Sequence, residues 1–144
     1  MKVLKDEVKI NATGERVWQI LTDFDAYPQW NPFIRSIQGK AEKGARLTAR
    51  IQPSGAMGMT FRPRVLRAEP GRELRWLGRL GVPCLFDGEH SFRIEPQETG
   101  VTFIQEESFR GLLVPLLSRS LGRDTLRGFR EMNQALKHRA ERTP

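Results

Sequence analysis

The feature that most constrains this fold is one long helical pattern that closes a chain otherwise made of short strand patterns. Between Leu117 and Ala140, apolar and small residues recur at spacings of three and four, the period of an amphipathic helix face. We predict a helix from about Leu113 to Ala140, with Pro115 in its first turn, where proline is tolerated. Because no other segment offers an apolar helical face of this size, a sheet in this fold must curve around the helix.

Seven segments of the chain show strand periodicity, and short turns join most of them. The predicted strands are Val3–Ile10, Ile34–Gln38, Arg46–Gln52, Met59–Ala68, Glu73–Leu80, Phe86–Glu95 and Gly100–Arg110. Short links favour an antiparallel arrangement, and Pro63 should lie at a sheet edge or bulge because it lacks a donor. We therefore predict an α+β fold, a seven-stranded curved antiparallel sheet wrapped around the C-terminal helix. With no linker or repeat in the sequence, residues 1–144 should form one domain.

Two short helices are predicted between the first two strands, in the segment Asn11–Phe33. Thr13 can cap the first helix, and Glu15 suits the positive charge of its N-terminal end. The second helix is short because Pro28 interrupts it. An aromatic cluster containing proline follows and directs the chain into the second strand.

This segment carries a spaced pattern of aromatic and polar residues, VW..L.D...Y..WNP. Its members are Val17, Trp18, Leu21, Asp23, Tyr27, Trp30, Asn31 and Pro32. The chain resembles the START/polyketide-cyclase-like (SRPBCC) superfamily, and within it the polyketide cyclase/dehydrase-like branch, whose members have such a signature after the first strand. The resemblance implies a helix-grip fold with a hydrophobic cavity between the sheet and the long helix.

Charge and composition narrow the classes of partner. The net charge is +7, from 24 basic and 17 acidic residues, but no block of five like charges occurs, which favours a solvated basic surface. The basic residues of the C-terminal helix lack the interleaved aromatic residues of RNA-binding surfaces, so no nucleic-acid partner is expected. The longest apolar run, Leu112–Leu117, is too short to span a membrane. The single Cys84 excludes an internal disulfide, and we predict a cytoplasmic monomer or homodimer.

Two polar residues stand out at inward positions of neighbouring strands. His90 shares a strand face with Phe92, and Glu107 shares one with Phe103. Counting outward from the turn at Gly100 brings His90 and Glu107 to a similar depth in the sheet. An imidazole beside a carboxylate can form an ion pair, a general base with its orienting group, or a polar anchor for a ligand. A satisfied structural pair is the alternative, and a one-residue bulge would turn Glu107 outward.

Strand alternation and the helical pattern together indicate which side chains would line an internal cavity. The predicted cavity residues are Trp30, Phe61, Trp76, Phe86, His90, Phe92, Phe103, Gln105, Glu107, Phe109, Phe129 and Met132. Other types of site have little support in the sequence. There is no nucleophile motif, no phosphate-binding glycine loop and no cluster of metal ligands, so neither a metal nor a cofactor is expected.

Three functions are compatible with these observations. The first is binding of a hydrophobic or amphipathic small molecule, such as a lipid, quinone or polyketide-like compound, in an internal cavity. The second is a cyclase or dehydrase in which His90 and Glu107 transfer protons while the cavity folds a reactive chain. The third is a basic module that docks an acidic protein or a membrane.

Overall fold

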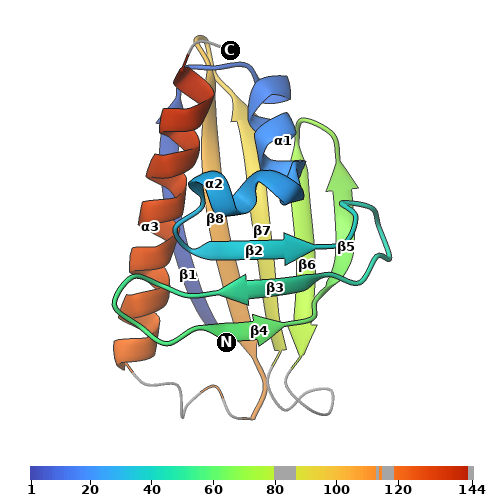
Figure 1. Cartoon of the computed structure of the whole chain (residues 1–144), viewed down its shortest axis with the longest axis vertical. Coiled ribbons are helices and arrows are strands. Elements are labelled where there is room, and N and C mark those ends of the chain that lie inside the picture. The colour runs from blue at the N-terminus through green and yellow to red at the C-terminus, as the bar shows by residue number, and fades with distance from the viewer. Residues whose placement is uncertain (80–86, 113, 115–118, 143–144) are drawn as a thin grey trace.

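The computed structural model describes residues 1–79, 87–112, 114 and 119–142 of the chain. Its helices and strands follow one another in the order that Figure 1 shows. They are β1 (Lys2–Ile10), α1 (Gly14–Thr22), a 3₁₀ turn (Phe24–Ala26), α2 (Tyr27–Trp30), β2 (Ile34–Gln38), β3 (Thr48–Ile51), β4 (Met59–Phe61), β5 (Arg64–Glu69), β6 (Glu73–Arg79), β7 (Asp87–Pro96), β8 (Val101–Arg110) and α3 (Arg119–Glu141). The predicted start of the last helix, at Leu113, lies outside the described residues.

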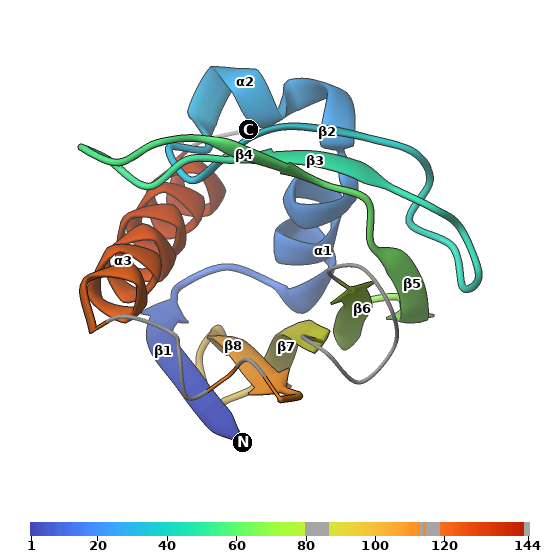
Figure 2. The ribbon, with the colours of Figure 1, turned by 90° about the horizontal axis from the view of Figure 1, so that it is seen from below.

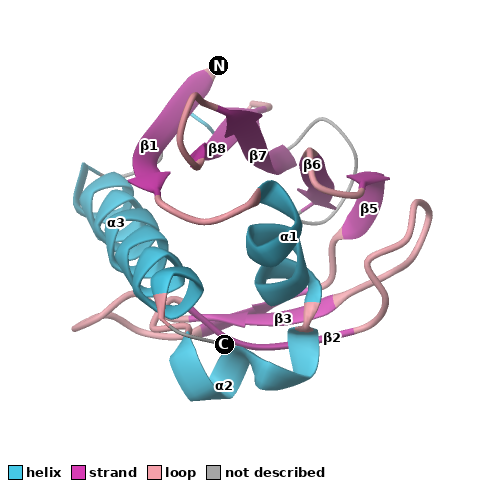
Figure 3. Cartoon of the chain, turned by 90° about the horizontal axis from the view of Figure 1, so that it is seen from above, coloured by secondary structure: helices cyan, strands magenta, loops and turns pink. Residues whose placement is uncertain are grey.

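The strands form two antiparallel sheets that face one another. The larger sheet has the order β1-β8-β7-β6-β5, and the smaller one the order β2-β3-β4. In Figure 1 the smaller sheet crosses in front of the larger one, and Figure 2 shows α3 along one side of the space between them. Figure 3 shows α1 between the two sheets, near the other side. The predicted α+β fold, with a curved antiparallel sheet and a long C-terminal helix, is confirmed.

The described residues form eight strands, so the prediction of seven was wrong. The segment predicted as one strand, Met59–Ala68, is divided at Pro63 into β4 and β5, which belong to different sheets. Pro63 has no N–H to continue a ladder, and its carbonyl instead accepts a hydrogen bond of 2.8 Å from Leu47 N. Together with the bridge between Arg46 and Arg64, this bond joins the two sheets at a corner. Proline therefore sets the point where the sheet turns.

The segment between β1 and β2 is fixed by side-chain caps and by burial. Thr13 Oγ1 accepts a hydrogen bond of 3.1 Å from Arg16 N at the start of α1, as the sequence predicted. The Tyr27 hydroxyl donates to the Leu21 carbonyl, and burial, assisted by the charge of Asp23, raises the pKa of this hydroxyl. Tyr27 therefore remains a neutral donor that ties α2 to α1.

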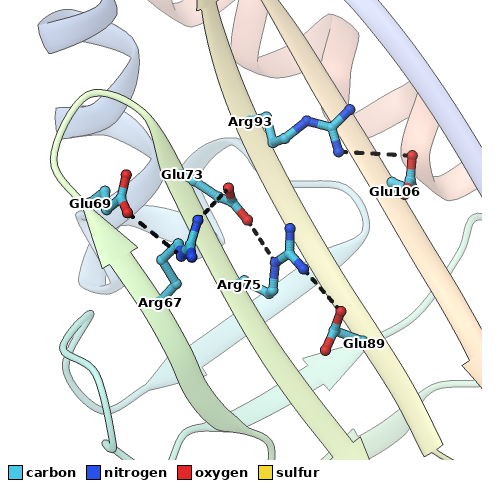
Figure 4. A network of polar contacts seen from close by, with 7 residues as sticks. All are labelled: Arg67, Glu69, Glu73, Arg75, Glu89, Arg93 and Glu106. Carbon is cyan, nitrogen blue, oxygen red and sulfur yellow. Dashed lines mark hydrogen bonds and ion pairs between the residues drawn. The ribbon is translucent and has the colours of Figure 1, made fainter.

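The outer face of the five-stranded sheet carries a network of opposite charges (Figure 4). Arg75 Nε lies 2.6 Å from Glu73 Oε2, and Arg75 Nη1 lies 3.1 Å from Glu89 Oε2. Partial burial acts to lower the pKa of Arg75, but the bonds to Glu73 and Glu89 outweigh it and the pKa is raised. Arg93 and Glu106 form a further outward pair at 3.9 Å. Because side chains alternate along a strand, residues next to these face the interior.

The interior between the two sheets is packed against one face of α3. Buried α3 residues are Phe129, Met132, Asn133, Leu136 and Ala140. Phe33, just before β2, reaches α3 at Gly128, and its ring lies edge-on to Phe129 with a centroid distance of 5.7 Å. A Cβ atom added at Gly128 would overlap the Phe33 ring. Glycine at this position therefore lets the smaller sheet approach the helix closely.

Replacing Gly128 by alanine should destabilise the protein, although alanine is the better helix former. Overpacking a core contact costs about 1–3 kcal/mol, and the severe overlap with Phe33 puts this contact at the upper end. After a gain of about 1 kcal/mol in helix propensity, we expect a net loss of about 2 kcal/mol. The matched control is Gly122→Ala on the same helix, where the nearest described atom to the new Cβ is the Lys2 ammonium at 3.1 Å. Urea titration should show a lower stability for Gly128→Ala and an unchanged or higher one for Gly122→Ala. Equal stabilities would contradict the close packing.

Candidate functional site

His90 and Glu107 lie side by side on the inner face of the five-stranded sheet. They are register partners on β7 and β8, in agreement with the count outward from the Gly100 turn. His90 Nδ1 lies 3.3 Å from Glu107 Oε1. The His90 side chain is 1% exposed and that of Glu107 is 17% exposed. The imidazole is therefore enclosed, while the carboxylate keeps some access to solvent.

A chain of hydrogen bonds continues from His90 across the interior to α3 and β1. His90 Nε2 lies 2.8 Å from Gln105 Oε1, and Gln105 Nε2 donates to Asn133 Oδ1 at 2.8 Å. Asn133 Nδ2 donates in turn to Asp6 Oδ2 at 2.9 Å. We refer to these five residues, Glu107, His90, Gln105, Asn133 and Asp6, as the polar chain. It links the sheet to the long helix through three fully enclosed side chains.

The far end of the polar chain sets the direction of its hydrogen bonds. Asn133 Nδ2 also donates to the Asp6 backbone carbonyl at 3.3 Å, and a carbonyl oxygen can only accept. The Asn133 amide therefore presents its oxygen to Gln105, which must donate through Nε2 and accept through Oε1. It follows that His90 Nε2 carries a hydrogen.

The direction of these hydrogen bonds determines which nitrogen of His90 carries a hydrogen and which faces Glu107. A neutral imidazole has one N–H, so with Nε2 protonated the Nδ1 atom is an acceptor that faces the Glu107 carboxylate. A hydrogen bond between Nδ1 and Glu107 Oε1 then requires a proton on one of the two atoms. The two groups therefore lie in the geometry of an acid–base pair.

Aromatic rings enclose His90 on the remaining sides. The centroid distances from its ring are 5.3 Å to Trp76, 4.6 Å to Phe92 and 5.2 Å to Phe129. Phe92 also stacks on Phe103 at 5.9 Å. The part of the interior between His90 and the β7–β8 turn is therefore occupied by side chains that contact one another.

On the other side of His90, toward the end of the sheet where β1 begins, two inner-face positions of β6 and β7 are occupied by glycine. Gly78 and Gly88 are register partners on β6 and β7, and Gly88 also pairs with Phe109 on β8. A Cβ atom at Gly88 would lie 3.0 Å from Glu107 Oε2. At Gly78 the nearest described atoms to a new Cβ are 3.9 Å away or more. Gly88 is buried under the Glu107 carboxylate and the Phe109 ring, and Gly78 beside it carries no side chain.

The smaller sheet presents apolar side chains to the same end of the molecule. Phe61 and Met59 on β4 are register partners of Ala49 and Ile51 on β3, so all four share one face, and Ala49 is fully buried. Yet Phe61 is 36% exposed and Met59 is 51% exposed. Figure 2 views the molecule from this end, with the two sheets and α3 arranged around it.

We call this region the open end, defined by Met59, Phe61, Gly78, Gly88 and Phe109. Pro63, two residues beyond Phe61, would lie 4.0 Å from a Cβ at Gly78, which places the two sheets next to each other here. Among the described residues, the open end therefore combines inward-facing apolar side chains that remain exposed, two glycines and a carboxylate.

The remaining predicted cavity residues occupy three different places. Phe92, Phe103, Phe129, Gln105 and Met132 are fully buried, and Trp76 is nearly so. Trp30 lies at the opposite end of the molecule, where it lines a surface groove beside α1 and the last turn of α3. Phe86 lies outside the described residues, as does Cys84.

Sequence analysis missed two members of the polar chain and the glycine pair. Asp6 occupies an inward position of β1 between Leu4 and Val8, and Asn133 interrupts the buried face of α3. A polar residue at a position where the periodicity calls for an apolar one was the available signal in both cases.

No group of three or more potential metal ligands is found among the described residues. In the described part of the chain, no helix is long and apolar enough to cross a membrane. The chemistry that the described residues offer is thus that of the polar chain and the apolar surfaces next to it.

The sequence matches, over residues 1–141, the family described as polyketide cyclase/dehydrase and lipid transport. The chain belongs to this family. The match spans β1 to α3, and so includes both the polar chain and the open end. No curated protein sequence is detectably similar to the chain.

Several solved structures share the fold of this protein, a member of the polyketide cyclase/dehydrase and lipid transport family. Protein MLL2253 from Mesorhizobium loti is 22% identical with a TM-score of 0.76, and 99% of each chain is covered. A START superfamily protein from Mycobacterium smegmatis is 22% identical with a TM-score of 0.73, covering 96% of this chain and 97% of that one. The di-domain ARO/CYC BexL is 15% identical with a TM-score of 0.75, covering 99% of this chain and 51% of that one. These likenesses confirm the START-like fold that the sequence indicated.

Proposed function

We propose that this protein binds a hydrophobic or amphipathic small molecule at the open end, between the larger sheet, the smaller sheet and α3. The observation that carries the proposal is that Phe61 and Met59 face inward and yet remain exposed. Exposed apolar surface of this kind is stabilised when a ligand covers it, by about 25 cal/mol per Å² removed from water. Membership of a family described by lipid transport supports the same reading.

The polar chain supplies the specificity of the proposed site. Glu107 lies against Gly88 and remains 17% exposed, so its carboxylate can accept a hydrogen bond from the polar end of a ligand. Apolar sites commonly orient their ligands through one or a few such groups. A long-chain alcohol meets both requirements, because its hydroxyl can donate to Glu107 while its chain lies against Phe61 and Met59.

A second candidate function is proton-transfer catalysis of the cyclase or dehydrase kind. It is favoured by the arrangement of His90 and Glu107, 3.3 Å apart with Nε2 committed to Gln105. The partly exposed carboxylate would exchange a proton with the substrate, and the enclosed imidazole would hold that proton in the meantime. The same two residues serve a carrier only as a polar anchor.

Substitution of the pair distinguishes the two functions. For a carrier, we expect wild type to bind a fluorescent long-chain alcohol with a Kd of about 1 μM, equivalent to about −8 kcal/mol. His90→Gln and Glu107→Gln should each weaken this binding less than tenfold, since most of the affinity comes from apolar contact. His138→Gln, on the exposed face of α3, is the matched control and should bind as wild type does.

Fluorescence titration measures the affinities, and mass spectrometry of the ligand after incubation measures turnover. Absence of binding to a panel of long-chain alcohols, acids and quinones would contradict the proposed function. A product that forms with wild type and is lost in both pair variants would establish the catalytic alternative. Native mass spectrometry of protein purified from its own host should reveal the natural ligand.

A further inference from the structure

A second concave surface lies at the opposite end of the molecule from the open end. It is a groove of about 510 Å³ between α1, α2 and the last turn of α3, at the end that Figure 3 views. Among the residues that line it are Arg16, Ile20, Asp23, Trp30, Arg139 and Arg142. Its volume falls within the range of small-molecule sites, about 300–1,000 Å³. We call it the basic groove.

Within the described part of the chain, the positive charges of the basic groove are not compensated by ion pairs. Among the described residues, no carboxylate lies within ion-pair distance of Arg16, Arg139 or Arg142. Arg16 Nη2 donates to the Arg139 carbonyl at 3.4 Å, and Arg139 Nη2 donates to Gln29 Oε1 at 3.3 Å. These neutral contacts hold the two guanidinium groups in place without neutralising them. One carboxylate, that of Asp23, lines the groove, so an excess of positive charge remains.

Local helix electrostatics explains part of this arrangement. Arg139 and Arg142 lie at the C-terminal end of α3, where the helix dipole favours cations. Arg16, however, lies in the first turn of α1, where the dipole disfavours a positive charge. Arg16 and Arg139 are both half-buried, and arginines that leave water are usually paired. Their positions therefore fit a function as an anion-binding pair better than a structural one.

The other wall of the groove is apolar. Ile20 is buried on α1, and Trp30 on α2 is half-buried with its ring edge-on to Tyr27 at a centroid distance of 5.2 Å. The groove therefore offers guanidinium groups on one side and an aromatic surface on the other. Guanidinium groups bind carboxylates and phosphates through paired N–H donors.

We propose that the basic groove binds a small organic anion, a carboxylate or phosphate ester, through Arg16, Arg139 and Arg142, with the apolar part of the anion against Trp30. This site is separate from the open end and does not depend on the ligand proposed there. Its occupant would bridge α1, α2 and the end of α3.

The test uses phenyl phosphate and benzoate as probes, with inorganic phosphate and benzyl alcohol as partial mimics that each lack one half of the proposed ligand. Binding is followed by NMR through the indole N–H of Trp30, which lines the groove. We expect saturable shifts with phenyl phosphate or benzoate, weaker binding of inorganic phosphate, and no shift with benzyl alcohol. Comparison of the two aromatic anions shows which head group the site prefers.

Three variants locate the site. Arg16→Gln and Arg142→Gln should each weaken binding of the better anion at least threefold, and Arg142 is exposed, so its replacement should leave the fold intact. Arg123→Gln, an exposed arginine near the other end of α3, is the matched control and should bind as wild type does.

Two results would overturn the proposal. The first is the absence of any Trp30 shift with both aromatic anions, and the second is an equal loss of binding in Arg123→Gln. Glu107→Gln should leave anion binding unchanged, so failure here and failure at the open end are distinguishable.

Discussion

Replacing Asn133 by leucine should lower the stability of the protein by about 2–4 kcal/mol, because buried polar groups left without partners cost about 1–3 kcal/mol each. Asn133 receives a hydrogen bond from Gln105 and donates one to Asp6. With leucine, the fully buried Gln105 amide loses its acceptor. Asp6 loses less, since its carboxylate is partly exposed and also lies 3.8 Å from Arg130 Nε.

The matched control is the next residue along the helix. Gln134 is exposed, so Gln134→Leu should change stability by less than about 0.5 kcal/mol. Guanidinium titration of both variants measures the difference, and NMR of the His90 ring nitrogens should show a loss of the fixed Nε2–H form in Asn133→Leu alone. If the stability of Asn133→Leu lay within about 0.5 kcal/mol of wild type, the hydrogen bonds of Asn133 to Gln105 and Asp6 would not stabilise the fold as described.

Strand alternation and helix periodicity predicted most of the architecture. The C-terminal helix was evident because its buried positions recur over many turns, and the hairpin of β7 and β8 followed from one turn between two long alternating segments. The division at Pro63 was not predicted, although a bulge or edge was. The sequence shows that proline ends a ladder of hydrogen bonds. The sheet that the next strand joins, however, depends on contacts between residues distant in sequence, such as Leu47 N with the Pro63 carbonyl.

The candidate site was predictable where it depends on local register. His90 and Glu107 could be paired by counting from the Gly100 turn, because a hairpin without a bulge fixes which residues are opposite. Asp6 and Asn133 come from elements distant in sequence, and only the packing of α3 on β1 brings them together. The role of Gly78 could not be predicted for another reason. The effect of a missing side chain depends on which residues surround it in space.

The basic groove likewise could not be predicted from the pattern of charges in the sequence. Arg139 was interpreted with the other arginines of the last helix as part of a solvated face. That interpretation treats the helix as isolated, whereas α1 and α2 pack beside its last turn and partly bury Arg139. The unusual position of Arg16 in the first turn of α1 was the signal available in the sequence.

Adding a large side chain at Gly78, in the open end, should weaken ligand binding strongly. At Gly78 a Cβ atom meets no described atom closer than the Gly88 carbonyl oxygen at 3.9 Å, so the described part of the chain can accept a Cβ there without distorting the sheet. We expect Gly78→Leu to reduce the affinity for a long-chain alcohol at least tenfold, or about 1.4 kcal/mol, because leucine would occupy the space of the ligand. Gly78→Ala, which adds one carbon, should retain most of the affinity.

The most direct measurement is fluorescence quenching by a brominated long-chain alcohol in a Trp18→Phe, Trp30→Phe variant. Trp76 is then the remaining tryptophan, and it is buried beside His90, two residues along β6 from Gly78. A ligand at the open end should quench Trp76 with saturation, and adding Gly78→Leu should remove the effect while the protein stays folded. Binding of the alcohol without quenching of Trp76, or equal quenching with Gly78→Leu, would contradict the proposed site.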